Sequence, residues 1–285
     1  MAVPLTPRGG APHDQPVEEI EIDLLLEAVH RQFGYDFRDY ARTSIRRRVW
    51  KMVRAEGLDS ISALQGRVLH EPAAWERFVQ GISVNVSAMF RDPHFFRAFR
   101  RHAVPVLRTY PFIRIWQAGC SLGEEAYSLA ILLAEEGLYD RSLIYATDIN
   151  DATLRRAREG IYPAELMQKY TQNYLQAGGT RSFSEYYTAR YEFALMRPSL
   201  HRNIVFSQHN LVSDGPFNEF NVVLCRNVMI YFNRDLQERT HRLLHDSLTK
   251  FGVLGLGAKE SLQFMALQHA YAQFEPGEKL YRRIA

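Results

Sequence analysis

The first part of the chain places apolar residues at helical spacing, with glycines where the pattern stops. Leu26, Val29 and Phe33 fall on one face of a helix that begins near Ile20 and ends before Gly34. The same spacing recurs three more times. The four expected helices span residues 20–33, 38–56, 60–69 and 73–82. The pattern therefore predicts a small all-helical domain, which we place at residues 19–83.

From Ile113 onward, short buried apolar runs alternate with helical segments. One expected strand begins at Ile113, and the others span 143–148, 203–210, 220–225, 252–257 and 279–284. This alternation predicts an α/β fold with a doubly wound, mostly parallel sheet. We place this second domain at residues 105–285 and the junction between the domains at 84–104.

The alternation breaks between Tyr162 and His201. Aromatic residues flank short β-like runs there, and Gly178-Gly179 marks a turn. We expect a small antiparallel β-subdomain inserted at about 163–201.

Composition bounds these expectations. The 285 residues are 46% hydrophobic and 24% charged, as in ordinary globular proteins. The net charge of +3 is too small to indicate a nucleic-acid partner by itself. Residues 1–18 read as a loose polar tail without the apolar core of a signal peptide, and no apolar run of about 18 residues predicts membrane insertion. Two cysteines make no disulfide framework, which favours a cytoplasmic location.

A glycine turn at residues 119–123 joins the first strand to a helix, so a ligand can lie against backbone N–H groups. The turn reads Gly-Cys-Ser-Leu-Gly-Glu-Glu, which is not a dinucleotide fingerprint, and no Lys follows. Glu124 and Glu125 occupy the helix start, where a pyrophosphate needs positive potential. The acids favour a cationic ligand, and adenosylmethionine carries a sulfonium and an amino group.

Polar residues also stand at the ends of later strands. Asp148, Asn210, Arg226 and Asn227 join Gly119 at the edge where a doubly wound sheet binds its ligands. Asp148 can accept both hydroxyls of a ribose. It can equally be the N-cap of the next helix.

Four motifs carry a family resemblance. They are Trp116-Gln-Ala-Gly-Cys-Ser-Leu-Gly-Glu-Glu-Ala-Tyr-Ser, Cys225-Arg-Asn-Val-Met-Ile-Tyr-Phe232, Met89-Phe-Arg-Asp and Ala146-Thr-Asp-Ile-Asn150. Together with the basic N-terminal helix, they closely resemble the chemotaxis-receptor glutamate methyltransferases, the CheR family, from about Asp23 to the C-terminus. The resemblance implies a class I methyltransferase fold. It also implies transfer of a methyl group from S-adenosyl-L-methionine to glutamate carboxylates on methyl-accepting chemotaxis receptors, leaving S-adenosyl-L-homocysteine.

Carried onto this sequence, the resemblance adds cofactor contacts from the junction and the strand ends. The predicted cofactor residues are Asn85, Ser87, Arg91, Gly119, Glu125, Asp148, Asn210, Leu211, Arg226 and Asn227. Ser87 stands where the family usually has Thr, Met89 where it has Phe, and Ala126 where it has Pro. The hydroxyl of Ser87 is retained, so we keep this residue in the site.

Arg91 and Tyr231 are the predicted catalytic residues, because the resemblance places both near the transferred methyl. A glutamate carboxylate is ionised at neutral pH and is itself the nucleophile, so no general base is needed. Arg91 is the group that would orient it. The alternatives are a structural ion pair for Arg91 and a core aromatic for Tyr231.

The helix over residues 38–56 has acids only near its two ends. Its predicted substrate-binding residues are Arg42, Arg46, Arg47, Arg48, Lys51 and Arg54. We expect them to dock on an acidic receptor bundle, although a solvated basic face is the ordinary alternative.

We expect a monomer that binds no nucleic acid. A nucleic-acid methyltransferase is a rival reading, but the Asn/Asp-Pro-Pro-aromatic motif is absent. A non-enzymatic adenosylmethionine sensor is the other rival.

No metal site is predicted. His241 and His245 are four residues apart on a helix, but no third ligand is evident, and two surface histidines explain the spacing.

Overall fold

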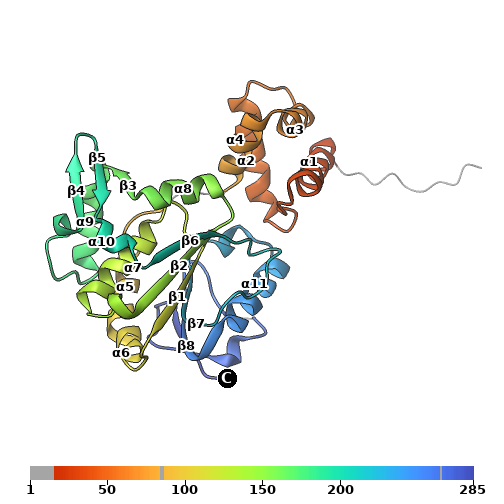
Figure 1. Ribbon diagram of the computed structural model, residues 1–285. Helices are drawn as coiled ribbons and strands as arrows, with labels where there is room; N and C mark the ends of the chain where they lie inside the picture. The colour runs from red at the N-terminus through yellow and green to blue at the C-terminus, as the bar shows by residue number, and fades with distance from the viewer. Residues whose placement is uncertain (1–15, 84–86, 264) are drawn as a thin grey trace, which may run out of the picture.

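The computed structural model describes residues 16–83, 87–263 and 265–285. An all-helical domain comes first (Figure 1). Its helices are α1 (Val17–Phe33), α2 (Arg42–Ala55), α3 (Ile61–His70) and α4 (Pro72–Ile82). Their apolar faces meet in one core that includes Leu25, Val49 and Phe78. The predicted helical domain is confirmed.

Two helix starts differ from expectation. Helix α1 begins at Val17, so residues 17 and 18 do not belong to the expected tail; Glu18 and Glu19 in its first turn pair with arginines of α2. Helix α2 begins at Arg42 rather than 38. The preceding segment instead pairs with the second domain, where the Ala41 N–H donates to the Tyr231 carbonyl (2.7 Å).

The second domain is built on a seven-stranded sheet. Its strands are β1 (Ile113–Ala118), β2 (Ser142–Asp148), β6 (Ile204–Gln208), β7 (Phe220–Cys225), β8 (Leu248–Leu256), β9 (Tyr271–Gln273) and β10 (Leu280–Arg283). The order is β6-β2-β1-β7-β8-β10-β9. The strands from β6 to β8 run parallel, and β10 and β9 close the sheet antiparallel. The expected doubly wound, mostly parallel sheet is confirmed; the short strand β9 was not predicted.

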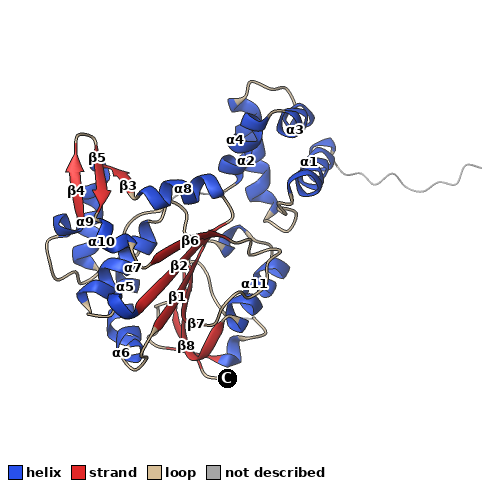
Figure 2. Ribbon diagram, viewed as in Figure 1, coloured by secondary structure: helices blue, strands red, loops and turns tan. Residues whose placement is uncertain are grey.

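Helices cover both faces of this sheet (Figure 2). They are α5 (Pro93–Ala98), α6 (Val104–Leu107), α7 (Glu124–Glu135), α8 (Asp151–Glu159) and α11 (Arg234–Asp246), with a π-helical turn at Phe99–Ala103. Alternate residues of β7 enter two different cores: Val222 and Leu224 pack on the α7 side, Val223 and Cys225 on the α11 side. All of β7 is buried, as expected for a central parallel strand.

The insertion holds a three-stranded antiparallel sheet, as predicted. Its strands are β3 (Ile161–Pro163), β4 (Tyr187–Arg190) and β5 (Phe193–Met196), in the order β3-β5-β4. The helices α9 (Met167–Gln176) and α10 (Pro198–His201) complete it. Helix α9 was not predicted; it buries Tyr170 and Tyr174 against the main core. Short 3-10 turns lie at Tyr139–Arg141, Ala164–Leu166, Phe183–Tyr186, Met229–Tyr231 and Gln268–Ala270.

The strand order reverses between β1 and β7. From β1 the chain proceeds through β2 to β6 on one side, and later through β7 to β8 on the other. Ligands of doubly wound sheets bind at the carboxyl ends of the strands at such a point. The helical domain lies beside this edge (Figure 1). Within the described ranges, no helix combines the length and apolarity needed to cross a membrane.

Candidate functional site

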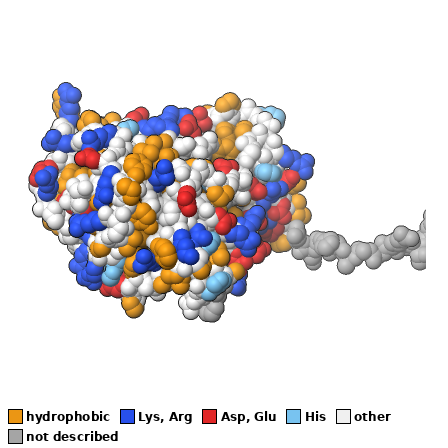
Figure 3. Space-filling view, turned by 60° about the horizontal axis from the view of Figure 1, so that its bottom comes forward, with side chains coloured by type: hydrophobic (Ala, Val, Ile, Leu, Met, Phe, Trp, Pro, Cys, Tyr) orange, Lys and Arg blue, Asp and Glu red, His pale blue; other side chains and the backbone are white. Residues whose placement is uncertain are grey.

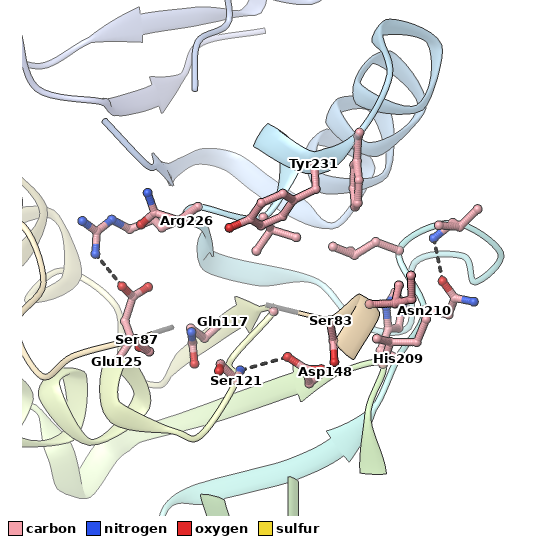
Figure 4. Close-up of a pocket in the computed structure, with 18 of the residues that line it drawn as sticks. Ser83, Ser87, Gln117, Ser121, Glu125, Asp148, His209, Asn210, Arg226 and Tyr231 are labelled. Atoms are coloured by element: carbon pink, nitrogen blue, oxygen red, sulfur yellow. Dashed lines mark hydrogen bonds and ion pairs between the residues drawn. The ribbon is translucent and has the colours of Figure 1, made fainter. Parts of the chain in front are cut away.

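A pocket opens at the reversal point (Figure 4), and residues of the helical domain line part of it. Its walls contain every predicted cofactor residue that the structure describes. These are Ser87, Arg91, Gly119, Glu125, Asp148, Asn210, Leu211, Arg226 and Asn227. Tyr231 lines the same pocket. Asn85 lies outside the described residues.

The glycine turn forms the pocket floor. The N–H groups of Gly119 and Cys120 both donate to the Thr147 carbonyl at 2.8 Å, which fixes the turn against β2. Gly119 has a φ of +77°, and a Cβ there would collide with the Val228 side chain. Only glycine meets both conditions. The turn therefore brings backbone close to whatever the pocket binds.

Asp148 is held at the end of β2 by backbone donors. It accepts from the N–H of Ser121 (2.9 Å) and from the N–H of Asn150 (3.0 Å). Burial raises the pKa of Asp148, and these donors oppose that shift. The N-cap alternative is wrong: the Asn150 side chain caps α8 by accepting from the N–H groups of Ala152 and Thr153.

Glu125 and Arg226 form a buried ion pair across the pocket (Figure 4). Arg226 also donates to Asp92 Oδ2 (3.0 Å) and to the Arg91 carbonyl (3.1 Å). Its guanidinium carbon lies 4.0 Å from the centroid of the Phe95 ring. Burial raises the pKa of Glu125, and Arg226 opposes the shift. Glu125 Oε1 is buried without a hydrogen-bond partner in the described part of the chain, so it can accept from a cationic ligand.

The neighbouring acid, Glu124, does not line the pocket. Glu124 is buried on another side of α7, near the Tyr170 hydroxyl (3.5 Å) and the Ser87 side chain. Burial raises its pKa. Of the two acids at the start of α7, the predicted Glu125 lines the pocket and Glu124 does not, because adjacent helical positions point in different directions.

Arg91 projects from a strained segment. Its neighbours Phe90 and Asp92 have φ values of +50° and +55°, which are costly for residues with side chains. The Phe90 N–H donates to Ser128 Oγ (2.9 Å), and the Asp92 carboxylate pairs with Arg226. Strain maintained by surrounding contacts is typical of functional sites.

The segment that carries Arg226 and Tyr231 is clamped by Glu260, which sequence reasoning missed. Glu260 is buried, and its carboxylate accepts from four backbone N–H groups. The donors are those of Gly257 (2.6 Å), Asn227 (2.9 Å), Val228 (2.9 Å) and Met229 (2.8 Å). The sequence feature that identifies Glu260 is the position of an acid three residues after the expected strand 252–257.

Two other missed residues stand at strand ends. Gln117 near the end of β1 and His209 just past β6 are both buried and line the pocket. Gln117 Oε1 and His209 Nδ1 lack hydrogen-bond partners among the described residues. His209 adjoins the predicted Asn210, and Gln117 lies two residues before Gly119, so their places at strand ends are the sequence signal that identifies them.

The helical domain supplies the remaining wall, through Tyr40, Ile82 and Ser83. Tyr40 forms an antiparallel bridge with Phe232, and the two rings lie 5.0 Å apart between centroids. Tyr231 is half-buried in this contact, and its side chain faces the pocket (Figure 4). It is therefore not simply a core aromatic.

The predicted basic face of α2 divides into two groups. Arg42 pairs with Glu19 and Asp23, and Arg46 pairs with Glu18. Arg48 turns inward, with its guanidinium carbon 4.6 Å from the centroid of the Tyr231 ring. Burial lowers the pKa of Arg48, and Tyr231 opposes that shift. These three arginines are thus already engaged by side chains of the chain itself.

The other basic residues of α2 are Arg47, Lys51 and Arg54. All three are exposed, and they form no ion pair with any residue that the structure describes. Their spacing places them along one side of the helix. Of the six basic residues predicted for docking, these three therefore combine exposure with the absence of an ion pair among the described residues.

The two histidines of α11 are not a surface pair. His241 is buried, and burial lowers its pKa to about 4. His245 contacts the Tyr271 hydroxyl through Nδ1 (3.1 Å). The described residues contain no group of three or more His, Cys, Asp or Glu side chains suited to a metal ion. Cys120 and Cys225 are buried and unpaired, as packing residues are.

Comparison with known families gives two matches. Residues 85–275 match the model described as "CheR methyltransferase, SAM binding domain", and residues 20–83 match "CheR methyltransferase, all-alpha domain". A protein of Pseudomonas putida named "Putative methyltransferase Cher3" is 49% identical over 265 residues, which cover 93% of this chain and 97% of that protein. A "Chemotaxis protein methyltransferase" of Salmonella typhimurium is 31% identical over 246 residues, covering 83% and 82%. One of Listeria innocua is 27% identical over 250 residues, covering 86% and 92%.

Proposed function

The chain belongs to the CheR methyltransferase family, and from that premise we propose that it methylates glutamate side chains of methyl-accepting chemoreceptors. The methyl donor is S-adenosyl-L-methionine. One observation carries the proposal: residues from five separate segments, all predicted from the sequence and its family resemblance, line one pocket at the reversal point of the sheet.

The side chains present fit this cofactor. Glu125 Oε1 is a buried acceptor suited to the amino group, and Asp148 is a fixed carboxylate suited to the ribose hydroxyls. Asn210 and Leu211 would contact the adenine, and Arg226 and Asn227 the methionine end. Arg226 is already engaged by Glu125 and Asp92. The lining also contains the two carboxylates Glu125 and Asp148, which suit a cation better than a pyrophosphate.

When bound, the cofactor supplies an electrophilic methyl group on a positive sulfonium. The chain's own residues position the acceptor. Arg91 would orient the incoming glutamate carboxylate by a charge-assisted hydrogen bond, and Tyr231 would border the position of attack. The position of the pocket between the two domains would exclude water from that carboxylate. Alignment and desolvation together are the catalytic contribution.

The receptor would dock on Arg47, Lys51 and Arg54. These exposed charges suit an acidic helical bundle, the cytoplasmic part of a chemoreceptor. We propose that a single copy of the chain acts in the cytoplasm and binds no nucleic acid. On the face shown in Figure 3, basic side chains are interspersed with acidic and apolar ones.

Transfer of radiolabelled methyl groups from S-adenosylmethionine tests the function. Purified receptor signalling domain and cellular RNA are offered to the enzyme in separate reactions. We expect label on the receptor that mild base releases as methanol, because methyl esters hydrolyse readily. Label in RNA alone would favour the nucleic-acid alternative. Tight S-adenosylhomocysteine binding without receptor labelling would favour a sensor.

A further inference from the structure

Arg48 occupies the interface between the two domains rather than the surface of α2. Its guanidinium lies over the Tyr231 ring, 4.6 Å from the ring centroid. Arg48 Nη1 donates to the Ile82 carbonyl at the end of α4, and Nε donates to Ser44 Oγ (3.2 Å). The guanidinium is thus held between the end of α4 and the ring of a pocket residue.

The backbone around Tyr231 is already fixed by the same domain. The Tyr231 carbonyl accepts from the Ala41 N–H (2.7 Å), and the Asn233 N–H donates to the Asp39 carbonyl (2.8 Å). Glu260 holds the preceding residues from the other side. These bonds fix where the segment lies, but they do not fix the rotation of the Tyr231 side chain. Arg48 is the cation that contacts that ring.

Arg48 also shares a helix with the proposed docking residues. Arg47 is its sequence neighbour and points to solvent, whereas Arg48 is half-buried and points to the pocket wall. Arg48 does not line the pocket itself. It therefore has no direct route to the cofactor, and its contact with the reaction runs through Tyr231.

We propose that Arg48 is a positioning residue for methyl transfer, which holds the Tyr231 ring in place and links it to the receptor-docking helix. The inference rests on the proposed function. It separates two neighbouring arginines by role: Arg47 governs receptor affinity, and Arg48 governs the rate of the bound complex.

The test compares R48M and R48K with R47M in steady-state receptor methylation. R48M keeps an unbranched apolar stem but removes the guanidinium, so we expect kcat to fall by about tenfold or more through misalignment. The receptor KM and the affinity for S-adenosylhomocysteine should change by less than about twofold. R48K should recover part of kcat. R47M should act on the receptor KM instead, and that effect should shrink in salt.

A double-mutant comparison covers the case in which R48M also loosens the domain interface. The same substitution is made in a Tyr231→Leu background, where the ring is absent. If Arg48 acts through Tyr231, R48M lowers kcat far less in that background than in the wild type. An equal loss in both backgrounds overturns the proposal. So does a raised receptor KM with unchanged kcat, which would make Arg48 a docking residue. If the wild type fails to methylate receptor at all, the proposed function fails instead.

Discussion

The pocket has two unlike walls. The sheet wall carries charges that are fixed by the protein itself: Asp148 by backbone N–H groups, Glu125 by Arg226. The described residues of the wall from the helical domain are uncharged: Tyr40, Ile82 and Ser83. The nearby cation Arg48 contacts Tyr231 rather than the cavity. The difference assigns cofactor recognition to the sheet wall, and acceptor docking and alignment to the helical domain.

The largest expected effect follows from removing the central cation of the sheet wall. R226M leaves Glu125 buried without its partner, so we expect a loss of about 3–5 kcal/mol in the free energy of unfolding. Urea denaturation measures it. The control is Arg239→Met, which removes an exposed arginine paired with Asp39 and should cost less than about 1 kcal/mol. Equal losses for the two variants would contradict the buried role of Arg226.

The next effect separates ligand binding from helix capping at the end of β2. D148N removes the charge that would meet the ribose, so we expect the affinity for S-adenosylhomocysteine to fall about tenfold to a hundredfold. N150A removes the cap of α8 and should cost about 1 kcal/mol of stability with little change in affinity. Calorimetric titration and thermal unfolding of both variants provide the measurements. A larger affinity loss in N150A than in D148N would refute the assignment.

Protein stability and cofactor affinity should both depend on pH through the carboxyl groups of the sheet wall. Burial raises the pKa of both Glu125 and Asp148 above the ordinary carboxyl value of about 4. The folded protein then binds protons more readily than the unfolded chain, so the stability contributed by these groups falls as pH rises from that ordinary value through the raised ones. Cofactor binding needs the ionised forms and should weaken as pH falls through the raised values. Titrations across mildly acidic pH should show this weakening, with a smaller change in E125Q. Affinity that stays flat would contradict it.

The smallest effect belongs to the helical domain. R47Q removes an exposed, unpaired charge and should raise the receptor KM about twofold, whereas R46Q removes a charge already paired with Glu18 and should do less. The triple variant R47Q/K51Q/R54Q should raise the KM about tenfold at low salt. Initial rates at several receptor concentrations and two salt concentrations distinguish these outcomes. An unchanged receptor KM in these variants would show that the receptor docks on another surface.

The sheet wall was predictable from sequence because local pattern determines it. Alternating strands and helices fix where each strand ends, and polar residues such as Asp148 and Arg226 stand out there. The local pattern did not indicate which way each side chain points. Glu124 and Glu125 are adjacent, yet only one lines the pocket, and Asn150 rather than Asp148 caps its helix.

The helical-domain wall was not predictable for the opposite reason. Tyr40 meets Phe232, and Arg48 meets Tyr231, across most of the length of the chain. No periodicity encodes such contacts. The basic composition of α2 suggested a single docking face, but the ion pairs with α1 require the helical domain to fold, and the contact of Arg48 with Tyr231 requires the two domains to pack. In the folded protein, α2 therefore presents Arg47 to solvent and Arg48 to the pocket wall.

The central claim is that this pocket transfers methyl groups to receptor glutamates. Peptide mass spectrometry of a receptor signalling domain, after incubation with enzyme and S-adenosylmethionine, tests it most directly. The account predicts base-labile methyl esters on glutamate side chains, their loss when those glutamates are replaced by alanine, and a strongly reduced yield with the D148N enzyme. Methyl groups on any other residue type, or an undiminished yield with D148N, would contradict it.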